Sequence, residues 1–221
     1  IVKPPTFAAT LNYAACAAQA ARLWKEFDSA KAEKYLATAI DAYKAYKAAY
    51  YEADLTTTKH PDLDCDCPKE ELNEESLYSP MWHAKGGGPY GDNYVLDDAY
   101  WAACELFVSA SQMGDDYASE ALKELESYKD AYQVTTKITG GENKGGSLTT
   151  FNWGNTASAG SLSLALHKDL LSDANAKTVE DSILKAAGDY IDTEESQGYG
   201  LPYAFVGDPY NDPNNLTPKI M

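Results

Sequence analysis

Stretches without charge alternate with charged stretches along this chain, and that alternation limits its fold more than any other feature. Helical periodicity and capping patterns predict six helices. Three of them are almost free of charge and cover residues 7–25, 95–112 and 155–167. The other three are amphipathic, with Lys, Glu and Asp on one face, and cover residues 28–52, 116–132 and 175–192. A helix without a charged face needs neighbours nearly all round, so we expect inner helices shielded by outer ones.

Alternating inner and outer helices predict an all-α fold with two concentric shells. This is the pattern of an α/α barrel of the six-hairpin type, of which about three hairpins are present here. A helical solenoid is the alternative, but solenoid repeats have a nearly constant period and short connections. Here the connections at 53–94 and 133–154 are long. The unequal spacing favours the barrel.

Long connections in a compact helical protein are often functional. Both connections follow an outer helix and lead into an inner one, so we expect them to gather at one mouth of the barrel. They carry aromatic residues beside Gly and Asn, and an aromatic face can stack on the apolar face of a pyranose ring. We predict four sugar-binding residues, although loop packing is the alternative role for any single aromatic: Trp82, Tyr90, Tyr94 and Trp153.

A cluster of oxygen-bearing side chains lies where the glycine-rich connection Gly86–Gly91 meets the second inner helix. The cluster consists of Asp92, Asn93, Asp97 and Asp98. Calcium takes six to eight oxygen ligands, including the backbone carbonyls that glycine-rich turns present easily. We predict a structural calcium site here. The simpler alternative is that the two helical aspartates only favour the positive end of the helix dipole.

Composition excludes several classes of function. The formal net charge of −16, from 18 basic and 34 acidic residues, argues against a nucleic acid or an anionic membrane as partner. No apolar run is long enough to span a bilayer, and the first residues lack a signal-peptide core, so we expect any targeting segment to lie outside this chain. Nucleophile elbows and phosphate-binding loops are absent. For Cys65 and Cys67, pairing with distant cysteines and metal ligation both remain open.

Three segments resemble glycoside hydrolase family 9, the inverting cellulases built on an (α/α)6 barrel. They are Pro4–Ala15, Gly86–Phe107 and Phe151–Asn155, with Gly198–Pro202 agreeing less specifically. The resemblance runs over essentially the whole chain. It implies that residues 1–221 are part of one catalytic module without a separate second domain. It further implies a secreted β-1,4-glucanase that acts on cellulose-type glucan, with a cellulosome scaffold as a further partner.

The resemblance also shows what this chain lacks. The family's Asp-Ala-Gly-Asp motif, which supplies the base that activates water, is absent. The chain also stops before the Glu that serves as the family's general acid. No catalytic residue is therefore assigned, and the remainder of the same catalytic module is the expected partner. The family's calcium position maps to Asp97 and Asp98, with carbonyls near Asp92 and Asn93, and its sugar-contacting tyrosine maps best to Tyr90.

Two other functions remain open from the sequence. One is a non-catalytic helical scaffold that binds a glycan or a protein. The other is an α/α-barrel enzyme that acts on another polysaccharide; an acidic substrate is disfavoured because the predicted mouth has few lysines and no arginine.

Overall fold

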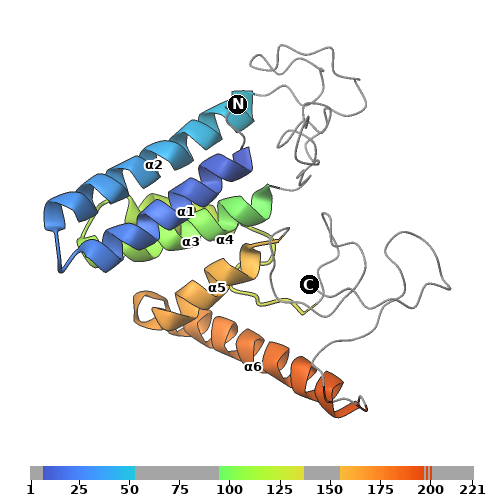
Figure 1. Cartoon of the computed structure of the whole chain (residues 1–221). Helices are drawn as coiled ribbons and strands as arrows, with labels where there is room; N and C mark the ends of the chain where they lie inside the picture. Colours follow the sequence, from blue (N-terminus) through green and yellow to red (C-terminus); the bar gives the residue numbers. More distant parts are fainter. Residues whose placement is uncertain (1–6, 53–94, 137–154, 197, 199, 201–221) are drawn as a thin grey trace, which may run out of the picture. The chain divides into compact units, whose positions relative to one another are not determined.

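The computed structural model describes residues 7–52, 95–136, 155–196, 198 and 200 (Figure 1). Its helices are α1 (Phe7–Trp24), α2 (Ser29–Glu52), α3 (Leu96–Met113), α4 (Ala118–Ser127), α5 (Ala157–Leu166) and α6 (Asp173–Ser196), with a short 3-10 helix η4 (Lys168–Leu170). Within these ranges there is no β-strand. The expected all-α class and the six predicted helices are confirmed. No helix in the described part is both long and apolar enough to cross a membrane.

Local signals in the sequence account for several helix ends. Asp28 caps α2, because its Oδ1 accepts the backbone N–H of Lys31 at 3.0 Å. Gly114 ends α3 in the left-handed region, at φ +72°, which a glycine adopts without steric cost. The predicted end of α4 at 132 is wrong. The helix ends at Ser127 because Tyr128 is extended, and Tyr132 has a φ of +64° that no α-helix accommodates.

The contacts divide the chain into two compact units, Ile1–Ala131 and Tyr132–Met221. In the first unit, α1 and α3 pack side by side and run parallel (Figure 1). Three side-chain contacts show the direction: Gln19 Nε2 to Glu105 Oε1 at 3.0 Å, Arg22 Nη1 to Ser109 Oγ at 3.2 Å, and Lys25 Nζ to the carbonyl of Gln112 at 2.5 Å. Because the residue numbers rise together in both helices, the starts of α1 and α3 lie at the same end of this unit.

Helices α2 and α4 run back along these two parallel helices. Phe7, at the start of α1, meets Tyr46 near the end of α2 with ring centroids 5.7 Å apart. Tyr100, at the start of α3, stacks on Tyr128, just beyond the end of α4, at 4.7 Å. Thirteen of the eighteen residues of α3 are buried, against two of ten in α4. The first unit thus has the inner and outer helices that the charge pattern predicts.

In the second unit, an irregular segment at 132–136 is held by serine side chains of α5 and α6. Ser182 of α6 accepts the N–H of Val134 at 2.7 Å and donates to its carbonyl at 3.3 Å. Ser161 of α5 donates to the carbonyl of Gln133 at 2.7 Å. These hydroxyls replace the regular hydrogen bonds that the segment lacks. Of α5 itself, half of the ten residues are buried.

Candidate functional site at the start of the inner helices

Two of the predicted metal ligands, Asp97 and Asp98, lie in the first turn of α3 and are both buried. Successive residues on a helix point about 100° apart, so α3 is enclosed on both of these sides. The positive end of the helix dipole favours negative charge here. Two carboxylates in a buried first turn are the kind of oxygen ligand that calcium prefers.

The other predicted site residues lie outside the described residues. These are Trp82, Tyr90, Asp92, Asn93, Tyr94 and Trp153. The structure therefore brings together only Asp97 and Asp98 of the predicted set. Among the residues that the structure does describe, no three His, Cys, Asp or Glu side chains form a group that could hold a metal ion. A further His, Cys, Asp or Glu ligand of a cation at Asp97 and Asp98 would have to come from outside the described residues.

A buried ion pair holds α3 against α1. Arg22 Nη1 lies 2.5 Å from Glu105 Oε2, and the two side chains are 10% and 1% exposed. The other carboxylate oxygen, Oε1, accepts hydrogen bonds from Gln19 Nε2 at 3.0 Å and from Trp101 Nε1 at 3.2 Å. One carboxylate oxygen thus accepts two hydrogen bonds and the other lies against the guanidinium of Arg22, so that two of the three partners are on α1. We call this cluster of Gln19, Arg22, Trp101 and Glu105 the α1–α3 ion-pair cluster.

The sequence pattern missed this cluster. Glu105 stands out as the one charge in the body of its predicted helix, and Arg22 follows directly on the charge-free stretch from Phe7 to Ala21. Two opposite charges, each standing alone in the body of an apolar helix, are a usable signal for a buried pair. The signal does not identify the partner, because the two residues are 83 positions apart.

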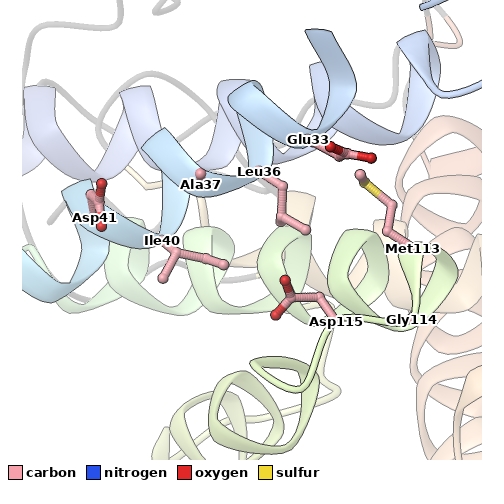
Figure 2. A pocket seen from close by; sticks show the side chains of 8 residues that line it. All are labelled: Glu33, Leu36, Ala37, Ile40, Asp41, Met113, Gly114 and Asp115. Carbon is pink, nitrogen blue, oxygen red and sulfur yellow. The ribbon is translucent and has the colours of Figure 1, made fainter. Parts of the chain in front are cut away.

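A pocket of about 330 Å³ lies at the other end of the first unit (Figure 2). Its residues come from α2, from the end of α3 and from the turn that follows α3, and they are Glu33, Leu36, Ala37, Ile40, Asp41, Met113, Gly114 and Asp115. The seventeen steps from Leu96 to Met113 along α3 correspond to about 26 Å. None of the described residues that line this pocket is aromatic, so they offer no surface on which a sugar would stack. It lies at the opposite end of α3 from Asp97 and Asp98.

Comparison with known proteins places the chain in a family. The family model for glycosyl hydrolase family 9 matches residues 2–216. The chain is 35% identical over 207 residues to a cellulose 1,4-beta-cellobiosidase of Acetivibrio thermocellus, and this match covers 91% of this chain and 20% of that protein. It is 30% identical over 207 residues to endoglucanase C of Cellulomonas fimi, covering 93% of this chain and 15% of that protein.

A solved structure agrees with these relatives. The crystal structure of a metagenome-derived glycoside hydrolase family 9 endoglucanase superposes with a TM-score of 0.58 at 25% identity, covering 91% of this chain and 29% of that one. The chain therefore spans less than a third of the length of the proteins it matches. The predicted resemblance and the α/α-barrel class are confirmed.

Proposed function

Because this chain belongs to glycoside hydrolase family 9, we propose that it forms part of a secreted, inverting β-1,4-glucanase that hydrolyses cellulose-type glucan. The family match over residues 2–216 carries this proposal. The relative named a cellobiosidase and the relative named an endoglucanase both support a glucan substrate. The non-catalytic scaffold and the enzyme for another polysaccharide are not favoured by any of these matches.

The parallel arrangement of α1 and α3 supports the role of this segment as barrel wall. Both inner helices begin at one end of the first unit, and the connection at 53–94 enters α3 there. In the proposal this end belongs to the substrate mouth. Trp82, Tyr90, Tyr94 and Trp153 are then the aromatic residues that stack on glucose rings.

The proposal gives the hydrolytic carboxylates to the rest of the module. Inversion needs an acid and a base about 6.5–9.5 Å apart across the scissile bond. Asp97 and Asp98 are adjacent on one helix and buried, so they do not fit that arrangement. The remainder of the same catalytic module is accordingly the partner of this chain.

The activity can be tested on the complete catalytic module, with the 221-residue chain as the comparison. We expect the complete module to release reducing sugar from carboxymethylcellulose or swollen cellulose, and the 221-residue chain to release none. Inversion at a β-linkage produces the α-anomer first, which proton NMR of the early product detects. Turnover by the 221-residue chain alone, or a β-anomer as first product, would contradict the proposal.

We further propose that Asp97 and Asp98 hold a structural calcium ion together with groups near Asp92 and Asn93. The donor chemistry fits, because both described residues are carboxylates and both are buried, where a cation would balance their charge. A bound calcium would fix the connection that precedes α3 to the start of that helix. It would supply binding energy to the fold and take no part in hydrolysis.

Calcium binding is measured on the complete module by the shift of its thermal unfolding midpoint on adding calcium to chelated protein. We expect the shift to be lost in Asp97→Asn and Asp98→Asn. The control is Asp116→Asn, at an exposed carboxylate beyond the end of α3, which should keep the shift. An unchanged shift in both site variants would remove these residues from any calcium site.

Secretion and attachment to a cellulosome scaffold complete the proposal. Cellulose is an insoluble polymer that does not enter a cell, so an enzyme that acts on it works outside. Mass spectrometry of the culture fluid and of purified cellulosomes tests both points. Finding the protein only inside cells would contradict secretion.

A further inference from the structure

The pocket between α2 and the end of α3 has an apolar floor, and we call it the α2–α3 pocket (Figure 2). Leu36 of α2 is buried, while Ile40 of α2 and Met113 of α3 are half-buried beside it. The volume of about 330 Å³ is that of a small ligand site, and such sites are mostly apolar with a few polar groups. The floor fits a short aliphatic chain.

Three exposed carboxylates surround this floor: Glu33 and Asp41 on α2, and Asp115 after α3. Asp115 Oδ1 accepts the backbone N–H of Tyr117 at 2.9 Å, and Figure 2 shows the Asp115 carboxylate pointing towards the floor. None of the described residues that line the pocket is basic. Within the described part of the chain, none of the three carboxylates forms an ion pair. The pocket therefore presents negative charge without a cation of its own.

The lysines in this part of α2 do not supply that cation. Lys31 Nζ lies 3.6 Å from the centroid of the Trp24 ring, and Lys44 Nζ lies 5.0 Å from that of Tyr117. Both ammonium groups are thus held over aromatic rings. Lys34 is exposed and is not among the residues that line the pocket. A bound cation would have to come from outside this group of side chains.

The spacing of the carboxylates decides which kind of cation fits. Among the described residues, no group of three His, Cys, Asp or Glu side chains could hold one metal ion, so the pocket is not a site for a single metal. Glu33 and Asp41 are eight residues apart on α2, which corresponds to about 12 Å along the helix axis. Leu36 and Ile40 come between them in the helix. A matching ligand carries positive charges at both ends of an apolar chain.

We propose that the α2–α3 pocket binds a linear aliphatic oligoamine. Its methylene groups lie on the apolar floor, as the stem of a lysine does on an apolar surface. Its terminal ammonium groups pair with Glu33 and Asp41 through charge-assisted hydrogen bonds, and Asp115 pairs with an inner one. The pocket lies at the opposite end of α3 from Asp97 and Asp98. The inference therefore goes beyond the proposed function and does not use the substrate mouth.

The experiment measures binding to the complete catalytic module by isothermal titration calorimetry at physiological salt. Spermidine is the probe, because it carries ammonium groups at both ends and within a methylene chain. Butylamine has a similar apolar chain with one charge, and magnesium has two charges without a chain. We expect spermidine to bind one site at least about tenfold more tightly than either, because its charges and its chain both contribute. No binding of spermidine, or magnesium binding as tightly, would overturn the proposal.

Variants then place the bound spermidine. Glu33→Gln and Asp41→Asn each should weaken its affinity about fivefold, the upper end for an ion pair exposed to water. Asp115→Asn should also weaken it, while the side-chain oxygen that accepts the Tyr117 N–H is retained. The control Asp116→Asn makes the same change of charge at an exposed residue that does not line the pocket, and it should keep the affinity. Equal affinities in the control and the pocket variants would place spermidine elsewhere and overturn the proposal.

A basic segment of a protein partner is the rival occupant. An end-blocked peptide with two lysines is titrated into the same module. If the peptide bound the pocket more tightly than spermidine, the pocket would be a protein-docking site and the proposal would fail. Glucan hydrolysis is scored separately. An active module that does not bind spermidine refutes this inference alone, whereas an inactive module that binds it in the α2–α3 pocket refutes only the proposed function.

Discussion

The seam between α1 and α3 and the outward side of α6 place their ionisable groups in opposite environments. In the seam, Arg22 and Glu105 are almost wholly removed from water. On α6, Lys177 pairs with Asp181 at 2.7 Å and Lys185 with Asp189 at 2.9 Å, and both lysines are about three-quarters exposed. The two kinds of pair have similar distances, so burial is what separates them.

Burial changes what an ion pair does for the fold. An exposed pair four residues apart on a helix adds little, because water and salt screen it. A buried charge that loses its partner is costly, because nothing solvates it. We therefore expect the α1–α3 ion-pair cluster to determine how these two helices align, and the pairs on α6 to matter little.

The largest effect is expected from breaking the seam pair. Arg22→Met leaves Glu105 buried without its cation, and we expect the complete module to lose about 3–5 kcal/mol of unfolding free energy. Urea denaturation measures this loss. Arg22→Met combined with Glu105→Leu removes both charges and should recover most of it. A loss in the double variant as large as in the single one would show that packing, not charge, dominates the seam.

The next effect concerns a buried phenol in the same unit. Burial, and then the negative charge of Glu124, raises the pKa of Tyr43 far above its ordinary value. The folded state therefore keeps Tyr43 neutral, and its contribution is complete below the unfolded pKa of about 10 and is lost as the pH rises above it.

At pH 11 this loss is about 1.4 kcal/mol of unfolding free energy for one such tyrosine. Tyr43→Phe should reduce the alkaline decline of stability by that amount. Urea denaturation at pH 9 and pH 11 gives the comparison. Identical declines in the two proteins would mean that Tyr43 ionises normally in the folded state.

A smaller effect is expected at the hydroxyl that joins the seam helices. Ser109 Oγ donates to the carbonyl of Ala18 at 2.5 Å and accepts from Arg22 Nη1 at 3.2 Å. Ser109→Ala removes both bonds, and we expect a loss of about 1–2 kcal/mol of unfolding free energy. Ser119→Ala, at an exposed position of α4, is the control and should change little.

The smallest effect is expected on α6. Asp181→Asn removes the partner of Lys177, whose pKa is raised by its hydrogen bond to Asp181 and then by the charge of that carboxylate. Because the lysine is about three-quarters exposed, we expect no resolvable change in the thermal unfolding midpoint at physiological salt. If Asp181→Asn destabilised the protein as much as Ser109→Ala, the contrast between the buried and the exposed ion pairs would be wrong.

Local pattern alone was sufficient for much of this protein. The six helices, the cap at Asp28 and the left-handed end at Gly114 follow from residue types within a few positions of one another. The family also follows from short segments that the comparisons confirm. Of the predicted site, only Asp97 and Asp98 are described, and their burial is consistent with the uncharged helix that surrounds them.

Tertiary structure alone decided the remaining features, because they depend on residues far apart in the chain. The parallel run of α1 and α3 and the pairing of Arg22 with Glu105 join positions more than 80 residues apart, which no local period encodes. The charge-free sequence predicted that α1 is buried, yet only the structure shows that Tyr13 and Leu23 of this helix are exposed. The reason is physical: sequence composition tells how much of a helix must avoid water, whereas the neighbours that are present decide which part does.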